Sequence, residues 1–162
     1  MAKVRKMCSG REYCSAQIAS LFRRWNAREY LFGGNEIAAA IAELERDGYI
    51  CDARFVRAYA RDKARFGGWG PEKILYKLRE IGLPAAIADD GSEKPLRSIV
   101  EQALDSVDTE GQLKKILSRK WLSLRKKEEP LAGKRARLLK FALSRGYSYS
   151  EAAKAVAEIT QP

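Results

Sequence analysis

The sequence predicts an all-α protein of about eight helices, and two observations support this prediction. Apolar residues recur at spacings of three and four along most of the 162 residues, as in the stripe Ile18, Leu21, Phe22 and Trp25. The alternation of apolar and polar residues that is typical of half-buried strands is almost missing. Because 46% of the residues are hydrophobic, the chain can also form a buried core.

Capping residues mark the ends of these helices. Asp52 and Asp108 can accept hydrogen bonds from the free amides at a helix start, and Pro71 suits a first helical turn because that turn needs no N–H. Ser148 and Glu151 have the spacing of a capping box. The glycines that suit left-handed helix ends are Gly48, Gly82 and Gly146.

A weak internal repeat divides the chain further. The segment Leu78–Gly82 is similar to Leu143–Tyr147, and each comes before an apolar stripe, so we expect two or three related helical units. The segment Asp89–Pro95 breaks the helical periodicity. We expect it to be a mobile, solvated loop.

The residue types argue against an enzyme and against a bound cofactor or metal. There is no histidine, and Cys8, Cys14 and Cys51 lack the spacing of zinc ligands, so we expect free thiols and no cofactor. The acidic pairs Asp89-Asp90 and Glu128-Glu129 are adjacent in sequence, and on a helix their side chains would diverge. We interpret them as solvated acids.

No part of the sequence indicates a membrane protein. It contains no run of eighteen apolar residues, and Met1–Gly10 lacks the apolar stretch of a signal peptide. We therefore expect a cytoplasmic protein without membrane contact.

Positive charge is concentrated in two regions. The whole chain has a formal net charge of +10, and residues 111–146 alone carry the same net charge. In the other region, Arg54, Arg57, Arg61 and Arg65 are spaced so that they follow one face of a helix. Such faces are either solvated surfaces or binding sites for phosphates and carboxylates.

The binding interpretation selects candidate residues in both regions. They are Arg54, Arg57, Arg61, Lys63 and Arg65 in the first region, and Lys114, Lys115, Arg119, Lys120, Lys134, Arg135, Arg137 and Lys140 in the second.

The segment Arg65–Gly70 places Phe66 and Trp69 among three glycines. The tryptophan could stack on a nucleobase, but a large aromatic side chain beside glycines is more often a packed cover of a hinge. We interpret this segment as a connector.

A resemblance to a known family rests on the central residues. The run Asp47–Phe55, continued by Ala58-Tyr59 and Arg61–Pro71, resembles the central signature of the RecX family. The later pattern of Leu138-Leu139, Leu143 and Arg145–Tyr147 is also similar to that family, so the resemblance extends from about Cys14 onward.

The resemblance implies a fold and a function. Members of this family consist of tandem three-helix units, similar to helix-turn-helix motifs, in a curved and elongated molecule. They bind the RecA filament on single-stranded DNA and inhibit strand exchange, ATP hydrolysis and co-protease function without catalysis of their own. The partners implied for this chain are the RecA filament and single-stranded or duplex DNA, and we expect a monomer.

The resemblance also implies unit boundaries. We expect an N-terminal extension at residues 1–14, a first three-helix unit at 15–69, a second at 70–127 with the inserted loop near 89–95, and a third at 128–162.

One alternative remains open. A stand-alone helical DNA-binding protein of the helix-turn-helix type would use the same charges on phosphates directly. Its binding to DNA should then weaken steeply with salt and show a preferred sequence. No helix of the sequence has the mixture of Asn, Gln and Arg that is expected for reading base edges.

Overall fold

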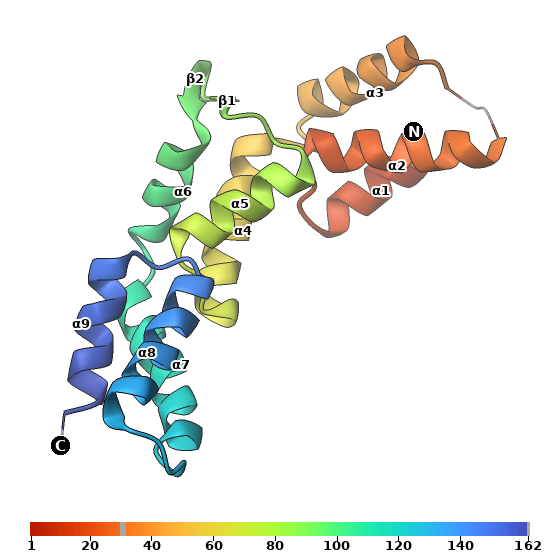
Figure 1. Ribbon diagram of the computed structural model, residues 1–162. Helices are drawn as coiled ribbons and strands as arrows, with labels where there is room; N and C mark the ends of the chain where they lie inside the picture. The colour runs from red at the N-terminus through yellow and green to blue at the C-terminus, as the bar shows by residue number, and fades with distance from the viewer. Residues whose placement is uncertain (30–31, 162) are drawn as a thin grey trace. The chain divides into compact units, whose positions relative to one another are not determined.

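The computed structural model describes residues 1–29 and 32–161, which form nine helices and one two-stranded sheet (Figure 1). The prediction of an all-α fold is confirmed, with one helix more than expected in the described residues. The elements are α1 (Ala2–Gly10), α2 (Ser15–Glu29), α3 (Gly34–Arg46), α4 (Asp52–Gly67), α5 (Pro71–Ile81), β1 (Ala86–Asp89), β2 (Ser92–Pro95), α6 (Leu96–Leu104), α7 (Thr109–Leu124), α8 (Leu131–Ser144) and α9 (Tyr149–Ile159).

The chain forms two compact units. Unit 1 comprises residues 1–58 and 78–99, and unit 2 comprises residues 59–77 and 100–162. The chain passes from one unit to the other within α4, α5 and α6. The boundaries of these two units differ from those of the three units that the sequence predicts. The three units remain a prediction.

The core of unit 1 forms where apolar stripes of the first helices meet. Val4 of α1, Ile18 and Phe22 of α2 and Leu44 of α3 pack with Ile50 in one buried cluster. Helix α1 lies within the expected N-terminal extension, yet its Val4 is fully buried. The extension is therefore part of the fold of unit 1.

Asp52 caps a helix, but not the one that it begins. Its Oδ1 accepts a hydrogen bond from the backbone N–H of Ser15 at 2.7 Å, and its Oδ2 accepts one from the Ser15 hydroxyl at 2.6 Å. The carboxylate thereby satisfies an amide at the start of α2, which has no acidic residue in its first turn. The contact ties the start of α4 to the start of α2 within unit 1.

Residues 89–95 belong to a hairpin and not to the loop that the sequence predicts, although residues 90–93 and 95 are solvent-exposed as expected. Strands β1 and β2 form an antiparallel hairpin whose turn is Asp90-Gly91, with positive φ angles of 48° and 80°. Asp-Gly is a favoured pair for such two-residue turns, because both residues tolerate the left-handed region. Alternation places Ile87 and Asp89 on the buried side of β1, with exposed fractions of 5% and 4%.

The core of unit 2 is a three-helix packing of α7, α8 and α9. Leu113 and Leu117 of α7, Leu138 of α8 and Val156 of α9 belong to one buried cluster together with Tyr147. The boundary expected at 127/128 would separate α7 from the helices that it packs against. The predicted caps are present at the starts of α7 and α9, because Asp108 accepts a hydrogen bond from Gly111 N–H and Ser148 forms a capping box with Glu151.

Two glycines join the start of α5 to the end of α8 within unit 2. The N–H of Gly70 donates to the carbonyl of Arg145 at 2.7 Å, and the N–H of Glu72 donates to the carbonyl of Gly146 at 3.2 Å. A Cβ atom on Gly70 would collide with the Gly146 carbonyl, and one on Gly146 would collide with the backbone of Lys73. Gly146 also has a φ of 85°, which confirms its predicted left-handed conformation.

The longest helices of residues 1–29 and 32–161 have 16 residues, and none combines the length and apolar character that a bilayer crossing requires.

Candidate basic binding surface

The arginines on the first half of α4 are held by acids of unit 1. The Nε of Arg54 lies 2.6 Å from Glu12 Oε1, and its Nη2 donates to the Gly48 carbonyl at 3.1 Å. The Nη2 of Arg57 lies 2.6 Å from both carboxylate oxygens of Asp89. These two predicted binding residues are therefore largely occupied by contacts within the fold.

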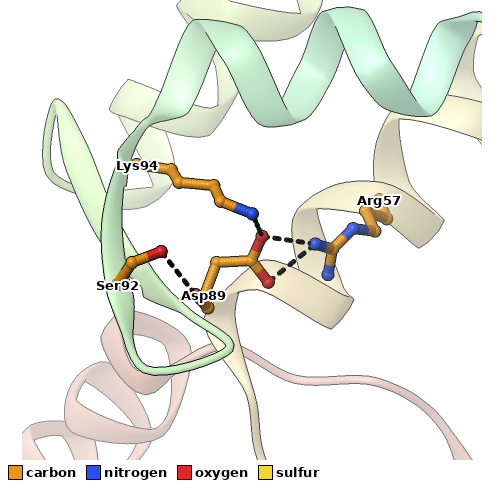
Figure 2. A network of polar contacts seen from close by, with 4 residues as sticks. All are labelled: Arg57, Asp89, Ser92 and Lys94. Carbon is orange, nitrogen blue, oxygen red and sulfur yellow. Dashed lines mark hydrogen bonds and ion pairs between the residues drawn. The ribbon is translucent and has the colours of Figure 1, made fainter.

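Asp89 is the centre of this polar network (Figure 2). Its side chain is 2% exposed and also accepts a hydrogen bond from Lys94 Nζ at 2.9 Å, while its backbone carbonyl accepts one from the Ser92 hydroxyl. Hydrogen bonds from Arg57 and Lys94 hold the pKa of this carboxylate below its usual value, although burial acts in the opposite direction. The interpretation of Asp89 as a solvated acid is wrong, because the hairpin turns its side chain toward α4.

The second half of α4, which belongs to unit 2, presents its cations differently. Arg61 is exposed and makes no ion pair or hydrogen bond in the described part of the chain. Arg65 is also exposed, and its contact is a long hydrogen bond of 3.5 Å to the Ser106 carbonyl. Phe66, beside it, is 86% exposed. This end of α4 therefore offers two available guanidinium groups and an exposed ring.

Two lysines of unit 2 lie near the ring of Trp69. The Nζ atoms of Lys63 and Lys73 lie 5.2 Å and 5.0 Å from its ring centroid, which is the range of cation–π contacts. The tryptophan also packs on Gly67, in agreement with a connector. Its neighbourhood is strongly basic.

Arg145 adds a third cation to this neighbourhood. Its Nη1 donates to the Gly67 carbonyl at 3.3 Å, and Lys73 Nζ donates to the Ser144 carbonyl at 3.2 Å. Burial, followed by the charges of Arg145 and Lys77, lowers the pKa of Lys73. No ion pair of the described residues involves Lys63, Lys73 or Arg145. We name Lys63, Trp69, Lys73 and Arg145 the tryptophan cluster.

Sequence reasoning missed Lys73 and Arg145 as candidate binding residues. The two side chains come from the α5 start and the α8 end, which are more than seventy residues apart along the chain. Only the junction of Gly70 with Gly146 brings them to Trp69.

On α7, the four predicted cations Lys114, Lys115, Arg119 and Lys120 differ in their surroundings. Lys114 forms ion pairs with Glu110 at 2.9 Å and Glu158 at 2.8 Å, and hydrogen bonds to these acids raise its pKa. Lys115 and Arg119 are exposed, lie one turn apart and have no ion pair among the described residues. Lys120 lies 5.7 Å from the Phe141 ring centroid.

On α8, three of the predicted cations have partners. Lys134 donates to the Arg125 carbonyl at 3.1 Å, Arg135 to the Thr160 hydroxyl at 2.8 Å, and Arg137 pairs with Glu129 at 3.0 Å. Lys140 is exposed and has no ion pair in the part of the chain that the structure describes. Among the predicted cations of unit 2, Arg61, Arg65, Lys115, Arg119 and Lys140 are thus exposed without an ion pair in the described residues, and the tryptophan cluster adds further cations.

The fold and these surfaces define a helical protein of tandem three-helix units with basic faces, and the comparisons agree with this class. The family model described as the second three-helix domain of RecX matches residues 52–91. This match covers α4, α5, β1 and the following turn, and it begins inside the expected first unit.

Solved structures with the same fold were found along almost the whole chain. The structure titled as that of RecX from Lactobacillus salivarius is 16% identical, with a TM-score of 0.71 over 98% of this chain and 95% of that chain. A second structure, titled as regulatory protein RecX, is 15% identical, with a TM-score of 0.73 over 97% of this chain and 71% of that chain. No curated protein matches the sequence. The chain therefore carries a central segment similar to a RecX domain and has the fold of the RecX structures.

Proposed function

We propose that this protein is a negative regulator of RecA that binds the RecA filament on single-stranded DNA and thereby inhibits strand exchange, ATP hydrolysis and co-protease function. The observation that carries this proposal is the match of residues 52–91 to a RecX domain. We place the activity in the cytoplasm, where RecA and chromosomal DNA meet, and we assign no catalytic step or cofactor to the protein.

The distribution of charge supports an anionic partner. The chain carries a net charge of +10, and unit 2 holds exposed cations that form no ion pair with any acid of the described residues. A filament offers both DNA phosphates and acidic protein side chains, and a basic protein is steered to such a surface by long-range attraction. If the protein binds one filament state better than another, it shifts the assembly equilibrium by that difference in affinity.

Within this proposal, the residues divide into two groups. Arg54, Arg57, Lys114 and Arg137 serve the fold through ion pairs with Glu12, Asp89, Glu110 and Glu129. The contacts to the filament are assigned to Arg61, Arg65, Lys115, Arg119, Lys140 and the tryptophan cluster.

A titration of RecA activity tests the proposal. The protein is added from substoichiometric amounts to cognate RecA on single-stranded DNA, and ATP hydrolysis and strand exchange are followed together. We expect both activities to fall as the protein is added. Unchanged activities at equimolar protein would refute the proposal, whereas tight, sequence-specific and salt-sensitive binding to free duplex DNA would support the helix-turn-helix alternative.

A further inference from the structure

Unit 1 contains a groove beside the hairpin that the proposed function does not use. It has a volume of about 540 Å³ and lies between the segment Ile50–Asp52 and the strand β1. Its apolar lining includes Ile50, Pro84, Ala86, Ile87 and Ala88. A concave, mostly apolar surface of this size lies in the range of ligand-binding sites.

One wall of this groove is an unpaired strand edge. The Asp90-Gly91 turn makes Asp89 and Ser92 a hydrogen-bonded pair, and Leu96 N–H donates to the Ala85 carbonyl at 2.7 Å. Bonded and non-bonded pairs alternate along an antiparallel ladder, so Ile87 also bonds to β2. The N–H and C=O groups of Ala86 and Ala88 therefore point away from β2, and in the described residues no hydrogen bond occupies them.

The hairpin is fixed in place on its other side. Asp89 points toward Arg57 of α4 and is also held by Lys94 of β2 (Figure 2). Because side chains alternate along a strand, Ala86 and Ala88 face away from the side on which Ile87 and Asp89 are buried. Their methyl groups leave room at the edge, so a third strand could approach β1 without displacing a large side chain.

The acidic residues that line the groove favour a positively charged partner. Although the protein as a whole is strongly basic, the groove is lined by the acids Glu45, Asp52 and Glu93. Burial and the neighbouring carboxylate of Asp52 raise the pKa of Glu45. A cationic partner would relieve this repulsion, whereas nucleic acid would increase it.

We propose that unit 1 binds an extended basic segment of a protein partner, which adds as a third strand to the free edge of β1 and places its cations beside Glu45 and Glu93. Backbone hydrogen bonds to Ala86 and Ala88 give this mode its affinity, and the groove selects the side chains. This site lies in unit 1 and does not depend on the proposed contacts of unit 2.

Binding of a short peptide to the full-length protein tests the proposal. The probe is a blocked peptide of alternating lysine and valine, followed by backbone NMR and amide hydrogen exchange. We expect shifts confined to the groove and slower exchange of the Ala86 and Ala88 amides. A peptide with glutamate in place of lysine, and one with N-methylated backbone amides, should bind at least about tenfold more weakly.

Variants of the protein separate the backbone contact from the charge. Ala88→Pro removes an outward-facing N–H on an edge strand, where proline is tolerated, and should weaken binding about tenfold, whereas Ala88→Ser keeps the N–H and should bind as the native protein does. The double variant E45Q/E93Q should lose about fivefold in affinity.

Several results would overturn the proposal. They are no binding of the lysine peptide at millimolar concentration, binding without protection of Ala86 and Ala88, and equal binding by folded Ala88→Pro. If Ala88→Pro does not fold, hydrogen exchange of the Ala86 and Ala88 amides in the native protein, with and without the lysine peptide, tests the proposal instead.

Discussion

At the scale of single residues, Asp89 shows how one buried carboxylate organises unit 1. It satisfies two cations that approach from different elements, Arg57 of α4 and Lys94 of β2. Arg57 and Lys94 are partly exposed and can also be solvated by water, whereas the Asp89 carboxylate is buried. The carboxylate therefore needs these two cations to compensate its negative charge.

Replacing Asp89 by asparagine should therefore lower the stability of the protein. The variant keeps the size of the side chain but loses two charge-assisted hydrogen bonds, so we expect a loss of about 2–3 kcal/mol in the free energy of unfolding. Denaturant titration measures this value. Asp90→Asn is a matched control, since Asp90 is exposed at the turn and asparagine tolerates its positive φ.

The same residue predicts a pH dependence. Its folded-state pKa lies below the usual value of aspartate, so its contribution to stability is present above the unfolded pKa and is lost as the pH falls through the folded pKa. The stability difference between the native protein and Asp89→Asn should thus be constant at neutral pH and shrink below about pH 4. A difference that grows in acid would contradict this assignment.

Tyr147 also buries a polar group, but unlike Asp89 it has no hydrogen-bond partner for that group, its hydroxyl, among the described residues. The residue is 3% exposed. Burial raises its pKa to about 12. Tyr147→Phe should therefore keep or increase stability, by up to about 1 kcal/mol, because it removes an unsatisfied hydroxyl from the core. Thermal unfolding tests this, and a loss above about 1 kcal/mol would reveal a hydrogen bond that we have not assigned.

At the scale of elements, α4 has two different halves. Arg54 and Arg57 are bound to Glu12 and Asp89 in unit 1, whereas Arg61 and Arg65 of unit 2 remain available. The even spacing of the four arginines in sequence gives no sign of this difference. It depends on acids that come from other elements.

Two double variants separate these halves. R61A/R65A should unfold at the same temperature as the native protein but inhibit the RecA ATPase several-fold less, because exposed cations contribute to binding and little to stability. R54A/R57A should lower the unfolding temperature clearly. Equal inhibition by folded R61A/R65A would remove these two residues from the filament surface.

The junction of α5 with α8 depends on two glycines. Gly70→Ala and Gly146→Ala should each destabilise the protein by about 1–3 kcal/mol, because the added methyl group collides with backbone atoms. Gly34→Ala is a suitable control, since it lies in the first turn of α3 with open space around it and should be neutral or slightly stabilising. Denaturant titration of the three variants tests whether Gly70→Ala and Gly146→Ala are less stable than Gly34→Ala.

The elements also show how far the sequence can predict the fold. Periodicity and caps are local signals, and they located the helices, Pro71, the Asp108 cap and the Ser148 capping box. The hairpin was missed because its strands have four residues each and its polar sequence resembles a loop. Its contact with Arg57 of α4 spans 32 positions, and no local pattern contains it.

At the scale of the whole molecule, the two units present surfaces of opposite character. Unit 2 carries the cations that we assign to the filament, and unit 1 contains a groove lined by Glu45, Asp52 and Glu93. The sequence predicted the concentration of charge in residues 111–146, but not which cations are used within the fold. The pairing of Lys114 with Glu158 and the approach of Arg145 to Trp69 both require the folded bundle.

Binding to the filament itself tests the central claim most directly. The protein is sedimented with RecA filaments on single-stranded DNA, alongside RecA alone and DNA alone. We predict that it sediments with the filament at moderate salt, and that changing Arg61, Arg65, Lys115, Arg119 and Lys140 together to glutamine releases it while the fold is kept. A protein that stays in the supernatant with filaments, or that binds them equally well after this change, would contradict the account.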